Sequence, residues 1–272
     1  MIARSFRALD TDVLVETDDA EVEGAVATLT GNYPPARAEP SLHYRLEGAT
    51  GVLQRDDETL RRGAPSIDLA LIADTDPQDQ VVRRAGESFL VHAAALAGRD
   101  GALLLVAQSG GGKTTMTRAL LARGARYLTD EASAIDTEHR VRGLPRTFTL
   151  EGPDPEGLAP PEAIGRIGTF RYRPVGGGVS MYRVVLTSPE RIVHEPVPVA
   201  AIVVLQYAPE EPSGLTRMPS AAALQTMWGQ NRRADAAGLE IAIALAGRFA
   251  VHRLVTHSID QGCADLAKIW SL

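Results

Sequence analysis

The sequence of 272 residues contains a single cysteine, Cys263, and only 5% aromatic residues. One cysteine excludes an intramolecular disulfide and a metal cluster held by several thiolates. His252 and His257 are not spaced as zinc ligands with any cysteine, so we expect no zinc site. This cysteine usage is typical of a reducing compartment, and we expect the protein to be cytoplasmic.

Long apolar runs and long basic runs are also lacking. No window reaches the roughly 18 apolar residues of a membrane helix, and the acidic residues Asp10, Asp12 and Glu16 follow the N-terminus too soon for a signal peptide. The formal net charge of −6 comes with no basic cluster, which argues against a nucleic-acid partner. Apolar residues make up 44% of the chain, enough for a sizeable core in one large domain or in a medium domain with a small appendage.

Glycine is concentrated at residues 107–114, where the sequence reads AQSGGGKT. Three consecutive glycines let backbone N–H groups approach phosphate oxygens without a Cβ in the way. This pattern is typical of a phosphate-binding (Walker A) loop, in which Lys113 reaches the β- and γ-phosphates of ATP and Thr114 binds Mg²⁺. The nucleotide-binding residues we predict are Ser109, Gly110, Gly111, Gly112, Lys113, Thr114 and Thr115.

The surroundings of this loop support the interpretation. A buried strand is predicted over 102–106 and a helix over 114–123 with Gly124 as its C-terminal cap, so the helix directs its positive end at the loop. Ala107 replaces the usual first glycine, which requires a negative φ at that residue. The alternative is a plain glycine-rich turn.

Asp130 and Glu131 follow the next predicted strand, 125–129. In a βαβ unit this strand ends at the same edge of the sheet as the phosphate loop, where ligands bind. Two carboxylates there can divide the work, one holding magnesium and the other orienting or deprotonating an acceptor hydroxyl. The alternative is a pair of solvated residues after a short strand.

The remaining pattern predicts an α/β fold with a small α+β lobe over residues 1–80 and a larger domain over 81–272. In the lobe we expect a helix over 20–29, a hairpin or solvated connection over 51–63, and strands over 5–16, 42–46 and 67–72. In the larger domain we expect a helix running into a strand over 80–95, a hairpin turn at 98–101, strands over 198–207 and 250–255, and helices over 220–228, 236–245 and around Cys263 and Trp270. Residues 153–174 are predicted to form a long loop beside the site, and the glycines at 176–178 a hairpin turn or a loop over it.

The stretch from Val91 through the glycine loop to Glu131 resembles the catalytic domain of HPr kinase/phosphorylase and its relatives, a group allied to ATP-dependent phosphoenolpyruvate carboxykinase. Within that group it is most similar to the stand-alone kinases of bacterial peptide-modification clusters, including lasso-peptide kinases. The close match covers residues 91–131, a weaker one covers 85–265, and the N-terminal lobe has no match. The resemblance implies a P-loop domain with a mixed sheet.

Site roles follow from the resemblance for individual positions. Asp130 matches the acidic residue proposed as the base, Glu131 the metal-binding partner, and His92 the active-site histidine. Arg146, in a Pro-Arg segment, matches a residue able to neutralise charge on the transferring phosphoryl group. From the residues alone, a histidine in an apolar strand such as His92 is more often a hydrogen-bonded core residue, and Arg146 is equally a surface residue. Glu131 replaces an aspartate, and a glycine-rich signature of the family has no copy here, so the resemblance does not extend to phosphorylase activity or to HPr as substrate.

These features together predict an ATP- and Mg²⁺-dependent kinase that phosphorylates a hydroxyl, with serine of a peptide or protein, such as a ribosomal peptide precursor, as the first choice. A small-molecule kinase and a nucleotide-binding regulatory protein without transferase activity remain as alternatives. No nucleic-acid or membrane partner is expected. A homo-oligomer is compatible with the resemblance, because HPr kinases assemble into hexamers.

Overall fold

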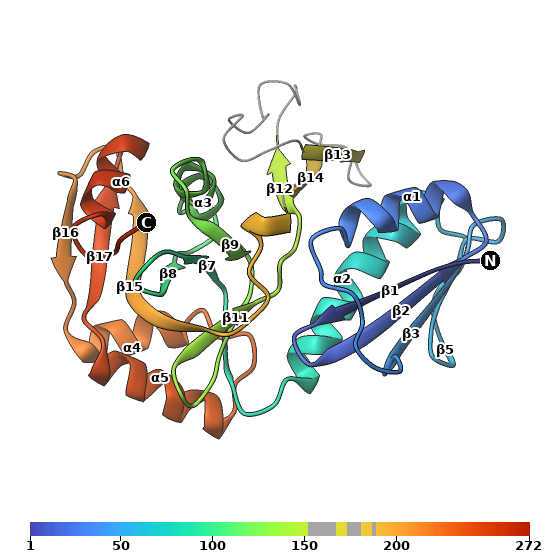
Figure 1. Ribbon diagram of the computed structural model, residues 1–272, viewed down its shortest axis with the longest axis horizontal. Helices are drawn as coiled ribbons and strands as arrows, with labels where there is room; N and C mark the ends of the chain where they lie inside the picture. The colour runs from blue at the N-terminus through green and yellow to red at the C-terminus, as the bar shows by residue number, and fades with distance from the viewer. Residues whose placement is uncertain (152–166, 173–180, 187–188) are drawn as a thin grey trace. The chain divides into compact units, whose positions relative to one another are not determined.

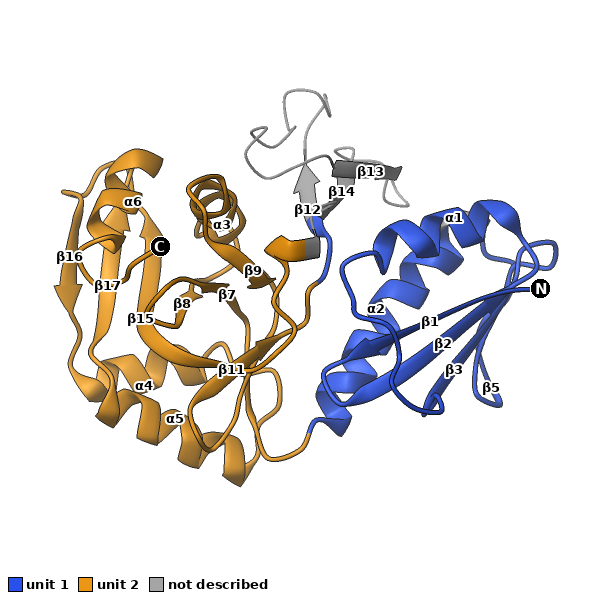
Figure 2. Ribbon diagram, viewed as in Figure 1, with its two compact units in different colours: residues 1–85, 146–159, 166–187 blue, residues 86–145, 160–165, 188–272 orange. Residues whose placement is uncertain are grey.

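The structure is a computed structural model that describes residues 1–151, 167–172, 181–186 and 189–272. The described residues form two compact units (Figure 2). The first contains Met1–Ala85 and three later strands, and the second contains Gly86–Pro145 and the chain from Pro189 to Leu272. The expected domain boundary at residue 80 therefore lies inside the last helix of the first unit, and the first unit takes in later parts of the chain.

The first unit is built on a five-stranded sheet in the order β1-β2-β3-β4-β5, in which only the β2–β3 pair is parallel. The strands are β1 (Ile2–Ala8), β2 (Thr11–Thr17), β3 (Leu42–Glu47), β4 (Val52–Arg55) and β5 (Glu58–Arg61). Two helices, α1 (Ala20–Leu29) and α2 (Ser66–Arg84), pack against each other and against this sheet (Figure 1). Asp19 caps α1 by accepting hydrogen bonds from the first-turn N–H groups of Glu21 and Val22.

Two strand predictions in this unit are wrong. Residues 5–16 form most of a hairpin rather than one strand, because Leu9 turns the chain with a φ of 51° and no glycine or proline marks that turn. Residues 67–72 belong to α2; this short, mostly apolar run is as compatible with a buried strand as with a helix. The expected helix over 20–29 is confirmed, as is a hairpin within 51–63.

A second, three-stranded sheet in this unit has the order β12-β14-β13. Its strands are β12 (Phe148–Glu151), β13 (Ile167–Tyr172) and β14 (Met181–Leu186), and β13 and β14 contact α1. The predicted loop over 153–174 therefore contains a strand, and the rest of that loop lies outside the described residues. The glycine run at 176–178 also lies outside them.

The second unit contains a nine-stranded mixed sheet with two pairs of helices. Its strands are β6 (Phe89–Val91), β7 (Ala93–Ala97), β8 (Ala102–Val106), β9 (Arg126–Thr129), β10 (Ser133–Ile135), β11 (Arg140–Gly143), β15 (Val197–Tyr207), β16 (Gly214–Arg217) and β17 (Val251–Thr256). Its helices are α3 (Lys113–Ala122), α4 (Ser220–Trp228), α5 (Ala236–Arg248) and α6 (Ile259–Leu266), with a short 3₁₀ turn, η2 (Pro189–Arg191). In Figure 1, α3 and α6 cover one side of this sheet and α4 and α5 the other.

The core beneath α4 and α5 shows why these segments pack where they do. Leu104 and Val106 of β8 point to the same face as alternate residues of one strand, and they pack in one buried cluster with Ala242 and Leu245 of α5. At the other end of β8, the indole N–H of Trp270 donates to the carbonyl of Gly101 across 3.0 Å and closes the β7–β8 turn. The helix expected around Cys263 and Trp270 contains Cys263 but not Trp270, because α6 ends at Leu266 and Trp270 is buried beyond it.

Strand directions in this unit bring several chain segments to one edge of the sheet. The local order is β17-β15-β8-β7-β9, with β8 and β17 both parallel to β15, and with β7 antiparallel to β8 and to β9. The carboxyl ends of β17, β15, β8 and β9 and the amino end of β7 therefore lie at the same edge. Because β7 stands between β8 and β9, the phosphate loop and the end of β9 are separated by one strand at that edge.

Most predictions for this unit are confirmed within a few residues. The strand over 198–207 corresponds to β15, that over 250–255 to β17, and the helices over 220–228 and 236–245 to α4 and α5. Gly124 ends α3 with a φ of 109°, and its N–H donates to the Leu121 carbonyl. The helix-to-strand prediction over 80–95 is correct only in outline, because β6 and β7 are separated at His92.

Candidate active site

The loop between β8 and α3 has the backbone that its glycines predict. Gly110 and Gly112 have φ values of 76° and 89°, in the left-handed region that favours glycine. A Cβ on Gly111 would lie 2.9 Å from the Ala107 Cβ, so the absence of that atom makes room for the alanine. Ala107 is not among the described non-glycine residues with positive φ, which meets the condition set by its replacement of glycine.

Helix α3 begins directly in this loop and leaves its first turn open to a ligand. Its N-cap is Gly112, no side chain caps the helix, and no acidic residue stands in the first turn. The N–H groups and the positive end of the helix dipole are thus directed at the loop, as in a phosphate site.

Lys113, the first residue of α3, is buried at 7% exposure and its Nζ donates to the Ala107 carbonyl across 2.7 Å. Burial lowers the pKa of Lys113, while the nearby Glu131 and Asp130 carboxylates act in the opposite direction. The ammonium is therefore held inside the loop, at the position from which the lysine of a phosphate-binding loop reaches phosphate oxygens.

Asp130 contacts the phosphate loop directly. The Thr114 hydroxyl donates to Asp130 Oδ2 across 3.1 Å, and the Tyr127 hydroxyl donates to Asp130 Oδ1 across 3.0 Å. The Asp130 N–H donates to the same Tyr127 hydroxyl across 3.1 Å. These bonds hold the carboxylate, which is 8% exposed, against the first turn of α3.

Glu131 lies beside the loop and is more accessible, with 28% of its side chain exposed. Its Oε1 accepts from the Arg232 guanidinium at 2.8 Å, and its Oε2 lies 3.8 Å from His92 Nε2. The Glu131 N–H donates to the Thr129 hydroxyl, which fixes the turn after β9.

His92 lies between β6 and β7 at the same edge of the sheet. Its backbone N–H donates a hydrogen bond to the Gln230 carbonyl. Burial lowers the pKa of His92; Glu131 opposes this effect, and Lys113 and Arg232 reinforce it. The imidazole is therefore neutral at pH 7, able to donate one hydrogen bond and accept another.

Arg146 belongs to the first unit, whereas the other predicted site residues belong to the second. Its guanidinium binds Asp74 Oδ2 at 2.9 Å and 3.2 Å, and the Asp74 side chain is 1% exposed. This pairing gives Arg146 a structural role within its own unit.

Two residues that bind the acidic pair, Tyr127 and Arg232, were not predicted from the sequence. Tyr127 carried a detectable signal, because a tyrosine in an apolar strand needs a partner for its hydroxyl, and Asp130 follows it three residues later. Arg232 carried none, since it lies 101 positions from Glu131. A backbone hydrogen bond places Arg232 beside the site: its backbone N–H donates to the Leu90 carbonyl, which joins the turn after α4 to β6.

The oxygen ligands present suit a magnesium ion. Mg²⁺ prefers hard oxygen donors, and it is held by one or two protein oxygens together with phosphates rather than by a complete protein cage. The Thr114 hydroxyl and the Asp130 carboxylate provide such a pair. The described part of the chain contains no cluster of three or more His, Cys, Asp or Glu side chains able to hold a metal by themselves.

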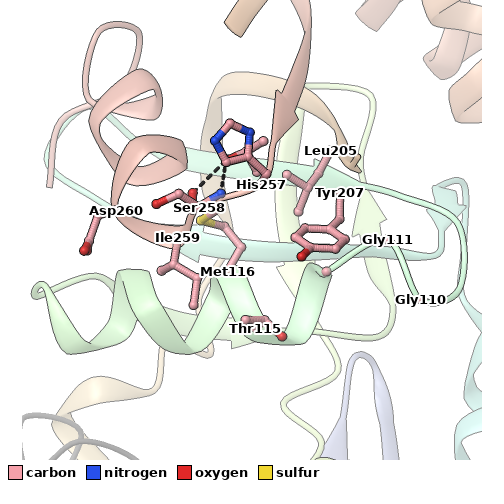
Figure 3. Close-up of a pocket in the computed structure, with 12 residues that line it drawn as sticks. Gly110, Gly111, Thr115, Met116, Leu205, Tyr207, His257, Ser258, Ile259 and Asp260 are labelled. Atoms are coloured by element: carbon pink, nitrogen blue, oxygen red, sulfur yellow. Dashed lines mark hydrogen bonds between the residues drawn. The ribbon is translucent and has the colours of Figure 1, made fainter. Parts of the chain in front are cut away.

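Two cavities open beside the phosphate loop. One of about 500 Å³ lies on the α6 side and is lined by the loop glycines and by the ends of β15 and β17 (Figure 3). The other, of about 690 Å³, lies on the α4 side, and its polar lining includes Gln108, Gln206, Gln225 and Gln230. The loop therefore borders enough open volume for a ligand larger than a phosphate group.

Comparison with known proteins adds little to this geometry. No family model and no curated protein matches the chain. Among solved structures it is similar to the HPr(Ser) kinase/phosphatase from Coxiella burnetii, with 14% identity and a TM-score of 0.31 over 64% of this chain and 89% of that chain. At that score the similarity establishes neither family nor function.

In the described part of the chain, every helix is too short or too polar to cross a bilayer.

Proposed function

We propose that this chain is a phosphotransferase that uses Mg²⁺ and ATP to phosphorylate the hydroxyl of a serine in a peptide or protein. The observation that carries the proposal is the 3.1 Å hydrogen bond from Thr114 to Asp130, because it joins a phosphate-binding helix to an acidic pair. A simple glycine-rich turn has no need of a buried lysine, an uncapped helix and two carboxylates at one point.

The loop supports binding of the triphosphate. Its backbone N–H groups and the start of α3 face the phosphate oxygens, and the Lys113 ammonium is drawn from the Ala107 carbonyl to the β- and γ-phosphates. When bound to Thr114 and Asp130, Mg²⁺ supplies neutralisation of charge on the phosphates. The protein contributes mainly position and fixed charge, which is what a loose phosphoryl transition state requires.

The contacts favour Glu131 over Asp130 as the group that orients the acceptor. The resemblance gave Asp130 as the base and Glu131 as the metal ligand, yet both Asp130 oxygens already accept hydrogen bonds and the residue is nearly buried. The more exposed Glu131 carboxylate can receive a serine hydroxyl. In this step the serine Oγ–P bond forms, the bond from the γ-phosphorus to the bridging oxygen breaks, ADP leaves, and the serine proton passes to Glu131.

His92 and Arg232 support this role of Glu131. Neutral His92 lies near one Glu131 oxygen and can hold the carboxylate or the acceptor by hydrogen bonds. The Arg232 guanidinium on the other Glu131 oxygen places a fixed positive charge beside the acidic pair, in the role that the sequence assigned to Arg146. Arg232 is therefore the arginine that we include in the proposed site.

The choice of a serine acceptor depends on the resemblance of residues 91–131 to kinases of peptide-modification clusters. To test it, the protein is incubated with γ-labelled ATP, Mg²⁺ and candidate peptides encoded beside its gene, with Glu131→Gln as the inactive control. We expect label in a peptide and a mass increase of about 80 Da on one serine. If ATP binds normally but neither peptides nor small hydroxyl compounds gain label, the chain is a nucleotide-binding regulatory protein and the proposal is wrong.

A further inference from the structure

The cavity on the α6 side of the phosphate loop has a mainly apolar lining, unlike the surroundings of the acidic pair. Its lining contains Met116 from α3 and Leu205 and Tyr207 from the end of β15, with Ile259 at the start of α6. In Figure 3 the Tyr207 ring lies on the loop side of this cavity and Ile259 on the side of α6. We refer to this cavity as the apolar pocket.

Two of these residues are unusually exposed for their type. Tyr207 is 58% exposed and Ile259 is 45% exposed, and both border the loop glycines across the same pocket. Exposed apolar side chains that line a concave site next to a polar binding loop mark a surface for an apolar part of the ligand.

The order of strands at the site edge gives the ligand a direction. From the phosphate loop, the charged groups Lys113, Asp130 and Glu131 lie toward β7 and β9, while the apolar pocket lies toward β15 and β17. A nucleoside triphosphate has the same polarity, with an anionic end and an aromatic end. With the γ-phosphate near the acidic pair, the nucleoside extends toward Tyr207 and Ile259.

Several polar side chains of this pocket are already hydrogen-bonded within the protein. The Thr256 hydroxyl donates to the Ser258 carbonyl at 2.6 Å, the Ser258 hydroxyl accepts from the Gln261 N–H, and His257 Nδ1 pairs with the Ser213 hydroxyl at 2.9 Å. Discrimination between bases requires hydrogen bonds to the base edge, whereas stacking on a face is tolerant of base identity.

We propose, on the basis of the kinase function above, that the apolar pocket binds the purine base of the nucleoside triphosphate by its faces, between Tyr207 and Ile259, and accepts adenine and guanine about equally. A purine suits the pocket better than a pyrimidine because its two fused rings cover more of the apolar lining. The cavity on the α4 side has a more polar lining, with the side-chain amides of Gln108, Gln206, Gln225 and Gln230, and is less suited to contact with the faces of a base.

The test is calorimetric titration of the full chain with MgATP, MgGTP and magnesium tripolyphosphate, for the wild type, Tyr207→Ala and Tyr207→Phe. We expect ATP and GTP to bind with affinities within about threefold of each other, and Tyr207→Ala to weaken both by about tenfold through loss of stacking. Tyr207→Phe should bind like the wild type, and tripolyphosphate should bind all three proteins equally. Ile259→Ala should weaken both nucleotides as well, whereas Ile243→Ala, a 50% exposed isoleucine on α5, should not.

Unchanged nucleotide affinity in Tyr207→Ala, or an equal loss for tripolyphosphate, would overturn the pocket assignment. A large preference for ATP or for GTP would overturn recognition by the faces of the base. If tripolyphosphate binds as tightly as ATP, the pocket assignment fails while the phosphate site stands. If none of the three binds to the wild type, the proposed function fails as well.

Discussion

The Thr114 hydroxyl donates a hydrogen bond to Asp130 Oδ2 across 3.1 Å and so links the first turn of α3 to the end of β9. Thr114 follows β8 and Asp130 follows β9, and these two strands are not neighbours, since β7 lies between them. The hydrogen bond forms because the carboxyl ends of β8 and β9 lie at the same edge of the sheet. A magnesium ion bound by these two oxygens would lie beside Lys113, next to the phosphates.

Replacing Lys113 with Met should remove the main positive charge from the phosphate loop. Because a hydrogen bond to a charged group contributes about 1.5–3 kcal/mol, we expect ATP affinity to fall by about tenfold to a hundredfold. The chain contains only one other lysine, Lys268, whose exposed side chain pairs with Asp265. Lys268→Met is thus the matched control, and calorimetry on both variants measures the difference. Equal ATP affinities in the two variants would refute the role of Lys113.

Tyr127→Phe removes only a hydroxyl, but that hydroxyl binds both the carboxylate and the N–H of Asp130. We expect a loss of about 1–3 kcal/mol in the free energy of unfolding, since a buried carboxylate loses one of its partners. We also expect a higher Mg²⁺ concentration for half-maximal transfer, because Asp130 is less firmly placed. Urea unfolding and a Mg²⁺ titration measure the two effects. A variant with reduced stability and an unchanged Mg²⁺ requirement would show that Tyr127 has a structural role alone.

Gly111→Ala introduces a Cβ at a point that has no room for it. That atom would lie 2.9 Å from the Ala107 Cβ and 3.0 Å from the Gln108 carbonyl oxygen, so the loop must shift. We expect a clear loss of ATP affinity. In Gly247→Ala, on α5, the new Cβ has nothing within 4 Å, and we expect a gain of about 0.5–1 kcal/mol in stability with normal ATP binding. Thermal unfolding with and without MgATP compares them, and normal ligand stabilisation of Gly111→Ala would contradict the loop geometry.

His92 should make the stability of the ligand-free protein depend on pH. Burial lowers the pKa of His92 in the folded state, so the unfolded chain takes up the proton first as the pH falls. Folding stability contributed by neutral His92 is therefore present above its unfolded pKa of about 6.5 and is lost as the pH falls below it. Urea unfolding at about pH 7.5 and about pH 5.5 should show a larger loss for the wild type than for His92→Gln. Equal losses of stability in the wild type and in His92→Gln would show that burial does not lower the pKa of His92.

Local sequence patterns predicted the parts of the fold whose signals are local. The glycines of the loop, the capped α1 and the apolar run of β15 each carry their own physical reason. The hairpin at Leu9 and the long helix α2 were missed because Leu9 adopts a positive φ without a glycine, and because residues 67–72 of α2 form a short, mostly apolar run. The period of such a short apolar run does not distinguish a buried strand from a buried helix.

Local patterns predicted less of the candidate site. Lys113, Thr114, Asp130, Glu131 and His92 meet at one sheet edge, as the order of strand, loop, helix and strand led us to expect. Arg232 reaches Glu131 only through the tertiary fold, and Arg146 pairs with Asp74, 72 positions away in the sequence. Pairs so distant in sequence are determined by packing, which a single sequence does not show.

The most direct test of the account is calorimetric binding of ATP with and without Mg²⁺ to the wild type, Asp130→Asn and Glu131→Gln. If Thr114 and Asp130 hold the ion beside the phosphates, Mg²⁺ will strengthen ATP binding to the wild type and to Glu131→Gln, while Asp130→Asn will bind ATP and lose that gain. Glu131→Gln should in addition transfer phosphate about a hundredfold to ten-thousandfold more slowly, as loss of a general base implies. An undiminished gain from Mg²⁺ in Asp130→Asn would show that the carboxylate and the glycine loop do not serve one triphosphate, and would contradict the account.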